Sequence, residues 1–145
     1  SQYAYRTDPI TAMSPFTTAE RSGLVDVLAL PDGQVLTLER ELGGFIPVYR
    51  TRVYLLDLTG ATDVTDVPSL SAGGFTATGK KLLWQGWFTS TNYEGFTLGP
   101  ALHDGPSPLI LVSDDGQGQL GQLQTLFSLK LKGMSVPVGA SSTAV

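Results

Sequence analysis

The sequence predicts an all-β protein built from similar strand-rich units. Of its 145 residues, 41% are hydrophobic and only 15% are charged, and 17 glycines and 9 prolines are spread along the chain. Short apolar runs separated by clusters of Gly, Pro and Asp are typical of strands joined by turns. No stretch predicts a long helix, so strands are expected to carry the fold.

The first part of the chain predicts an edge strand followed by a set of four strands. Residues 2–6 alternate polar and aromatic side chains, and Asp8-Pro9 ends this strand because proline has no N–H to donate to a ladder. Apolar runs at residues 24–30 and 35–40 flank the tight turn Pro31-Asp32-Gly33-Gln34, which indicates a β-hairpin. Two further strands are expected at residues 52–58 and 80–85.

The same pattern restarts further along the chain. Residues 92–98 and 109–115 predict a second hairpin around the turn signal Asp104-Gly105, and residues 124–131 predict another strand. Residues 26–30 and 94–98 align, each with an acidic residue followed by alternating apolar positions. The resulting repeat has a period of about 70 residues and four strands, as in a β-propeller blade with long outer loops.

This repeat predicts a β-propeller-like fold with about two four-stranded antiparallel blades of a larger propeller. The partial propeller domain would cover residues 1–132, with a first blade at about 24–88, a second at about 92–138, and residues 133–145 as a tail or closing strand. Closure needs at least about four blades, so both flanks would be open and apolar. We therefore expect another chain to cover the flanks, and residues 2–6 to pair with a segment outside residues 1–145.

Acidic residues gather where the second hairpin begins and ends. Glu94 lies at the start of the first strand and Asp114-Asp115 at the end of the second, and these two points are neighbours in an antiparallel hairpin. Carboxylates that lie close together repel unless a proton or a cation sits among them, which predicts a metal or acid/base site. With Asn92 they offer the oxygen ligands that calcium prefers. In the alternative interpretation, Asp114-Asp115-Gly116 merely opens a polar turn.

Composition and spacing exclude several other functions. The net charge is −4 and the 9 Lys and Arg residues are scattered, which argues against binding to nucleic acid. The chain has no cysteine, and its one histidine, His103, is expected at the opposite end of the hairpin from Ser113, so these two cannot form a catalytic triad. No apolar run approaches the ~20 residues needed to cross a bilayer.

Five segments of the sequence resemble one known family. They are residues 2–5 with Asp8-Pro9, 24–40 (LVDVLALPDGQVLTLER), 52–64 (RVYLLDLTGATDV), 92–98 (NYEGFTL) and 111–115 (LVSDD). In this order they look like the C-terminal half of the family known for esterase-like activity of phytase, a calcium-associated β-propeller group. The resemblance implies that Glu94 and Asp114 or Asp115 lie near a central tunnel, with Asp26 and Glu39 in the neighbouring blade. Glu39 could instead simply pair with Arg40 or Arg52.

The resemblance implies half of a calcium-dependent hydrolase that acts on a phosphate or carboxylate ester. The missing N-terminal half would be carried on another polypeptide, and the location would be extracellular or periplasmic. The alternative is a non-catalytic propeller fragment that serves as a binding or scaffold subunit. The expected catalytic residues are Glu94 and Asp114, the calcium ligands Asn92, Glu94, Asp114 and Asp115, and the substrate-binding residues Asp26, Glu39 and Arg40.

Overall fold

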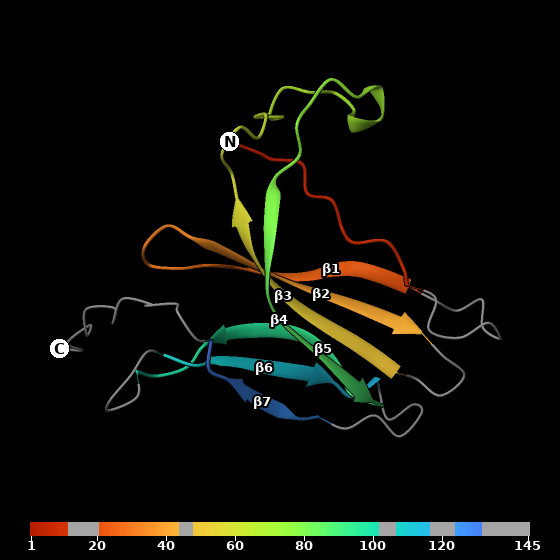
Figure 1. Cartoon of the computed structure of the whole chain (residues 1–145), viewed down its shortest axis with the longest axis vertical. Helices are drawn as coiled ribbons and strands as arrows, with labels where there is room; N and C mark the ends of the chain where they lie inside the picture. Colours follow the sequence, from red (N-terminus) through yellow and green to blue (C-terminus); the bar gives the residue numbers. More distant parts are fainter. Residues whose placement is uncertain (12–20, 44–47, 102–106, 117–123, 132–145) are drawn as a thin grey trace.

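The chain folds into two antiparallel β-sheets that pack face to face (Figure 1). The structure is a computed structural model, and it describes residues 1–11, 21–43, 48–101, 107–116 and 124–131. The four-stranded sheet has the order β1 (Arg21–Ala29), β2 (Val35–Gly43), β3 (Val48–Asp57) and β4 (Gly79–Thr89), and the three-stranded sheet has the order β5 (Asn92–Leu98), β6 (Leu109–Asp114) and β7 (Leu126–Leu129).

Both predicted hairpins are present. The β1–β2 turn closes with a hydrogen bond from Leu30 N to Gln34 O of 2.8 Å, and Gly33 adopts the positive φ of 85° that this turn requires. The Asp32 carboxylate accepts the backbone N–H of Gln34 at 3.0 Å and fixes the turn further. In the second hairpin, β5 and β6 pair from Asn92 with Asp114 to Leu98 with Leu109. The turn predicted at Asp104-Gly105 lies outside the described residues, as does His103.

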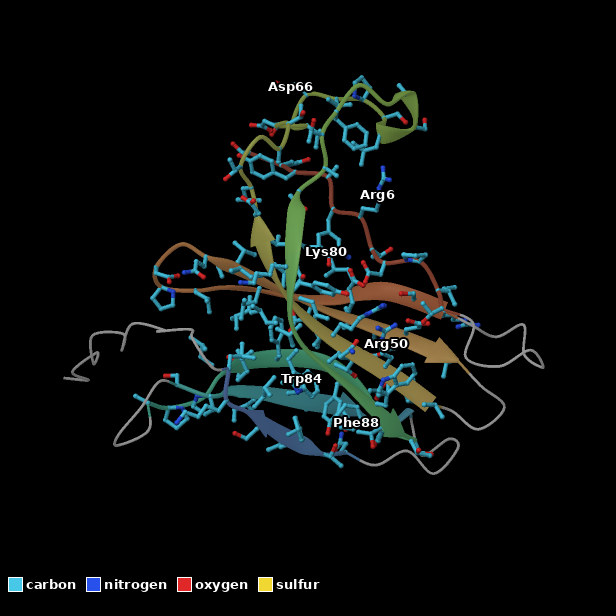
Figure 2. The ribbon with its side chains drawn as sticks, viewed as in Figure 1. Arg6, Arg50, Asp66, Lys80, Trp84 and Phe88 are labelled. Carbon is cyan, nitrogen blue, oxygen red and sulfur yellow. The ribbon has the colours of Figure 1, made fainter. Side chains whose placement is uncertain are left out.

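The core lies between the two sheets. Alternation along β2 points Leu36 and Leu38 toward the three-stranded sheet, where Phe96 and Leu111 meet them. Aromatic rings fill one end of this layer. Trp84 and Phe88 of β4 lie over the three-stranded sheet (Figure 2), and the Phe88 ring packs edge-on against Tyr93 with centroids 4.8 Å apart. Packing between the predicted blades is therefore aromatic and aliphatic.

The two hairpins contact each other through their first strands. The Asp26 side chain on β1 accepts the backbone N–H of Phe96 on β5 at 2.9 Å. Each first strand also has a bulge, between Leu24 and Asp26 in β1 and between Tyr93 and Gly95 in β5. The bulged residues are Val25 and Glu94, which lie one position apart in the alignment of residues 26–30 with 94–98. The described strands form two antiparallel sheets and do not show closure into a propeller.

Residues 1–11, which we call the N-terminal strap, run along the four-stranded sheet on the side away from the core. Tyr3 forms an isolated antiparallel bridge with Asp63, in the long connection between β3 and β4 that also holds the short 3-10 helix η1 (Leu70–Ala72). We expected residues 2–6 to form a strand that pairs outside residues 1–145; they form no strand, and within the chain the β3–β4 connection supplies backbone partners for Gln2, Tyr3 and Ala4. The strand expected beyond β7 lies outside the described residues.

No helix in the described part of the chain is long and apolar enough to cross a membrane.

Candidate functional site

An ion pair joins the two sheets next to the contact between β1 and β5. Arg40 alternates with Leu38 on the face of β2 that looks toward the three-stranded sheet, and Glu94 occupies the bulge in β5. Arg40 Nη2 lies 2.9 Å from Glu94 Oε1. The two side chains are 22% and 38% exposed, so the pair is open to solvent on one side.

Asn92 completes this cluster from the same strand as Glu94. Its side-chain amide donates to Glu94 Oε1 at 2.7 Å, so that one carboxylate oxygen accepts from both Asn92 and Arg40. Among the described residues, the buried atoms Asn92 Oδ1 and Arg40 Nε have no hydrogen-bond partner. The cluster therefore combines the Arg40 guanidinium and the Glu94 carboxylate with one unused hydrogen-bond acceptor, Asn92 Oδ1, and one unused donor, Arg40 Nε.

Asp26 holds the neighbouring backbone. One of its carboxylate oxygens accepts from Phe96 N and the other from Val27 N at 2.8 Å. Gly95 lies directly beside this contact, and a Cβ there would meet Val112 Cγ1 at 3.0 Å and Asp26 Oδ2 at 3.7 Å. Asp26 thus fixes the stretch of β5 that follows Glu94.

The structure describes the contacts of two of the predicted acidic residues, Asp114 and Glu94. Asp114 pairs in register with Asn92, and its carboxylate accepts the backbone N–H of Gly116 at 3.1 Å, where Gly116 has a φ of 58°. This contact is the one expected of a residue that opens a polar turn. Glu94 is instead bound by Arg40, which comes from the other sheet.

The described residues do not fit a complete calcium site. Calcium takes about six to eight oxygen ligands, mostly from carboxylates and carbonyls. In the described parts of the chain, no three His, Cys, Asp or Glu side chains come together in a way that could hold a metal ion. Glu94 Oε1 already accepts from a guanidinium, whose positive charge would repel a nearby cation.

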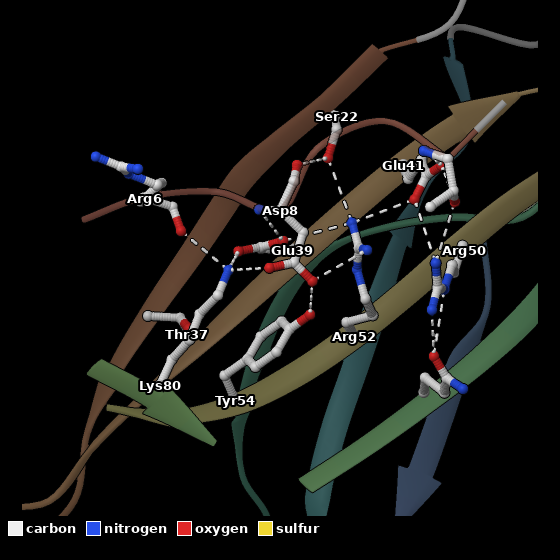
Figure 3. Close-up of polar contacts among 12 residues, drawn as sticks. Arg6, Asp8, Ser22, Thr37, Glu39, Glu41, Arg50, Arg52, Tyr54 and Lys80 are labelled. Carbon is white, nitrogen blue, oxygen red and sulfur yellow. Dashed lines mark hydrogen bonds and ion pairs between the residues drawn. The ribbon is translucent and has the colours of Figure 1, made fainter. Parts of the chain in front are cut away.

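Glu39 lies on the opposite face of β2 from Arg40, in a buried ionic network under the strap (Figure 3). Its carboxylate is fully buried and lies 3.4 Å from Arg52 Nη2, so the pairing with Arg52 considered above is confirmed. It also accepts from the Tyr5 hydroxyl and from Lys80. Glu39 therefore does not share a site with Arg40 and Glu94.

The rest of this network was not predicted. Glu41 is also fully buried, with its carboxylate 3.3 Å from Arg52 Nη2 and 3.7 Å from Arg50 Nη1. Asp8 of the strap lies 2.6 Å from Lys80 Nζ and 3.3 Å from Arg52 Nη1. The available signal was the alternation of charged residues two apart on β2 and β3, which places them on one face of the sheet.

Burial and hydrogen bonding shift the pKa values of three groups in this network. Burial is the largest cause that raises the pKa of Tyr5 and of Tyr54 well above 10.0, and the hydrogen bonds to Glu39 and Asp8 add to it. Burial also acts to raise the pKa of Asp8. Hydrogen bonds from Lys80 and Tyr54, with the charges of Lys80 and Arg52, outweigh that effect and hold the Asp8 pKa below 3.8.

Comparison with known proteins gives one family match. No curated protein and no solved structure matches the chain significantly. The model of the Phytase-like family, described as esterase-like activity of phytase, matches residues 1–117. These residues include both hairpins up to Asp114 and the Arg40–Glu94 pair. The chain therefore belongs to the Phytase-like family.

Proposed function

We propose that this chain contributes the Arg40–Glu94–Asn92 cluster to the active site of a hydrolase that acts on a phosphate or carboxylate ester. The observation that carries the proposal is the partly exposed ion pair of 2.9 Å between the two sheets. A guanidinium binds the oxygens of a phosphate or carboxylate in a planar, bidentate geometry, and a carboxylate accepts a proton from water. Membership of the Phytase-like family supports the reaction class.

In this proposal Arg40 binds the phosphoryl oxygens of a phosphate ester or the carbonyl oxygen of a carboxylate ester, and Glu94 acts as the general base. A water molecule gives a proton to Glu94 while its oxygen bonds to the phosphorus or carbonyl carbon of the ester. The bond to the alcohol oxygen then breaks, and the leaving alcohol takes the proton back from Glu94. Asn92 and Asp26 are positioning residues, since Asn92 donates to the Glu94 carboxylate and Asp26 fixes the backbone beyond it.

A calcium requirement would need ligands in addition to those that the described residues bring together, so no step is assigned to the metal. Asp114 and Asp115 would enter a metal site only with groups from elsewhere. The proposed source is the other half of the propeller on another polypeptide, in an extracellular or periplasmic location.

Hydrolysis of p-nitrophenyl phosphate and p-nitrophenyl acetate by the intact assembly of this chain with the other half of the propeller, with and without a chelator, tests this function. Glu94→Gln is expected to lower kcat by a factor on the order of 10²–10⁴, because it removes the base and keeps the side-chain size. Arg40→Lys should mainly raise KM. Asp32→Asn is the matched control, since the contacts of Asp32 lie within its own turn. Full activity of Glu94→Gln would refute the assignment.

The second candidate function is a non-catalytic binding or scaffold subunit. The free face of the three-stranded sheet favours it, because Val112 and Leu126 lie opposite each other there and are 45% and 75% exposed. The same assays separate the two functions. Absence of turnover of either ester by the intact wild-type assembly, in the presence of added calcium, would favour the scaffold.

A further inference from the structure

The face of the four-stranded sheet that lies away from the core carries polar and charged side chains, whereas most side chains on the core-facing side are apolar. On β2 and β3 the outward positions carry Thr37, Glu39, Glu41, Arg52 and Tyr54, and Glu39, Glu41 and Arg52 among them are buried. What covers them is the N-terminal strap, residues 1–11 (Figure 3). The face is thus closed by a segment of the same chain.

The strap is held mainly by polar contacts. Asp8 pairs with Lys80 and Arg52 and accepts from the Tyr54 hydroxyl. Elsewhere in the strap, Tyr5 donates to Glu39, and Thr11 donates to Glu41 from both its backbone and its hydroxyl at 2.7 Å. Backbone bonds add to these, from Val64 N to Gln2 O at 2.8 Å and from Thr78 N to Ala4 O at 2.9 Å.

Little apolar surface of the strap is buried. Ala4 is its one buried hydrophobic residue, while Tyr3 and Ile10 are exposed, and none of the three belongs to the core between the sheets. Release of the strap would therefore cost electrostatic contacts and leave the apolar core unchanged. Segments with few buried apolar contacts open with lower free energies than the rest of a domain.

The charges on this face balance only when the strap is closed. Three anions, Asp8, Glu39 and Glu41, meet three cations, Arg50, Arg52 and Lys80. Asp8 is the one acidic group of the strap in this network, and its side chain is only partly covered, so protons can reach it. Neutral Asp8 would leave Lys80 and Arg52 with only the two buried glutamates as anionic partners.

We propose that the N-terminal strap is an acid-sensitive clasp, which opens as a unit from the four-stranded sheet when Asp8 loses its charge and leaves the two-sheet core folded. The groups that face Asp8 are Lys80 from β4, Arg52 and Tyr54 from β3, Glu39 from β2 and Ser22 from β1. Opening uncovers the carboxylates of Glu39 and Glu41 and the cations between them. The clasp lies on the opposite face of the sheet from the Arg40–Glu94 pair, so it does not depend on the function proposed above.

The pH dependence has a definite sign. The pKa of Asp8 in the folded protein is held below 3.8 by Lys80 and Tyr54 against the effect of burial. A carboxyl group whose pKa is lower in the folded than in the unfolded protein stabilises the folded form at any pH above the unfolded-state pKa. This stabilisation is lost as the pH falls through the folded-state pKa. The clasp is therefore closed at neutral pH and opens in acid, at a pH below the usual aspartate pKa of 3.8.

Amide hydrogen exchange at neutral pH tests the clasp. Thr11 of the strap donates its amide to Glu41, and the amides of Val64 and Thr78 donate to Gln2 and Ala4 of the strap. In Asp8→Asn, these three amides should exchange at least tenfold faster than in the wild type. The amides of Phe96 and Ser113 in the three-stranded sheet should exchange at unchanged rates. Asp32→Asn is the matched control and should change none of these rates.

Wild-type protein studied at decreasing pH provides the second measurement, which needs no substitution. The same three amides should lose protection before that of Ser113, which donates to the backbone carbonyl of Thr125. Two results would overturn the proposal: unchanged protection of Thr11, Val64 and Thr78 in Asp8→Asn, or loss of protection in both sheets together with the strap.

Discussion

At the scale of single residues, Arg52 is the group on which the buried network depends most. Its side chain is 2% exposed and lies within 3.4 Å of Glu39, Glu41 and Asp8 carboxylate oxygens. Removal of one partner from a buried ion pair leaves an uncompensated charge, which typically costs about 3–5 kcal/mol. Without Arg52, Glu39 would keep only Lys80 and Glu41 only Arg50 as a cationic partner.

Arg52→Met is therefore expected to lower the free energy of unfolding by about 3–5 kcal/mol. Urea denaturation followed by tryptophan fluorescence measures the change. Arg21→Met, at an exposed position of β1, is the control for the loss of an arginine from the same sheet and should change stability little. A loss below about 1 kcal/mol for Arg52→Met would mean that the network contributes no more than surface ion pairs do.

The sequence anticipated some of these residue contacts and missed others for a structural reason. Arg52 was one of two partners considered for Glu39, and alternation along β2 is enough to explain why Arg40 is the wrong one. The partner of Glu94 could not be anticipated, because the prediction assumed a regular hairpin. The bulge between Tyr93 and Gly95 takes Glu94 out of the ladder, and a bulge of one residue is not visible in residue spacing.

At the scale of elements, seven predicted strands are present and the four of the first sheet are longer than expected, whereas residues 2–6 form only the isolated bridge at Tyr3. β4 continues to Thr89, past Gly86, where a glycine would ordinarily weaken a strand. A Cβ at Gly86 would lie 2.7 Å from the Trp84 ring and 2.8 Å from the Phe88 ring. Gly86 is therefore required by aromatic packing across it. β1 and β2 also extend beyond the predicted apolar runs, and the added residues include Arg21, which pairs with Leu42, and Glu41, which pairs with Ser22.

The contact between the strap and the sheet also predicts an alkaline transition. Tyr5 and Tyr54 donate their hydroxyls to Glu39 and Asp8, and burial with these contacts raises both pKa values above 10.0. A group whose pKa is higher in the folded than in the unfolded protein stabilises the folded state at any pH below the unfolded-state pKa. This stabilisation is lost as the pH rises through the folded-state pKa. The strap should therefore detach at alkaline pH, above 10.

Comparison of the wild type with the Tyr5→Phe/Tyr54→Phe double variant isolates these two phenols. Phenolate absorbance in the difference titration should appear only above pH 10.0, the usual tyrosine value. Amide exchange of Thr78, which donates to Ala4 of the strap, should accelerate over the same pH range in the wild type. A difference titration centred at or below pH 10.0 would contradict the buried placement of both hydroxyls.

At the scale of the whole molecule, the two outer faces differ from each other. Two open apolar flanks were expected, and for the four-stranded sheet this is wrong, because β2 and β3 carry charged residues outward and the strap covers them. The three-stranded sheet keeps an open face where Val112 and Leu126 are paired across strands and exposed. The sequence shows that the strands are rich in apolar residues, but it does not show which face of the four-stranded sheet the strap covers.

The open face leads to the last prediction, that another chain covers the three-stranded sheet and leaves the strap side free. Contiguous exposed apolar surface is typical of protein–protein contacts, and Val112 and Leu126 are neighbours on this face. We expect light scattering on the purified protein to show a defined complex or self-association, and Val112→Ser/Leu126→Ser to reduce it. Val27→Ser is the matched control, because Val27 is also exposed but lies opposite Thr37 on the outer face of the four-stranded sheet. A wild-type monomer that unfolds cooperatively, with no change in the double variant, would contradict the need for a partner on this face.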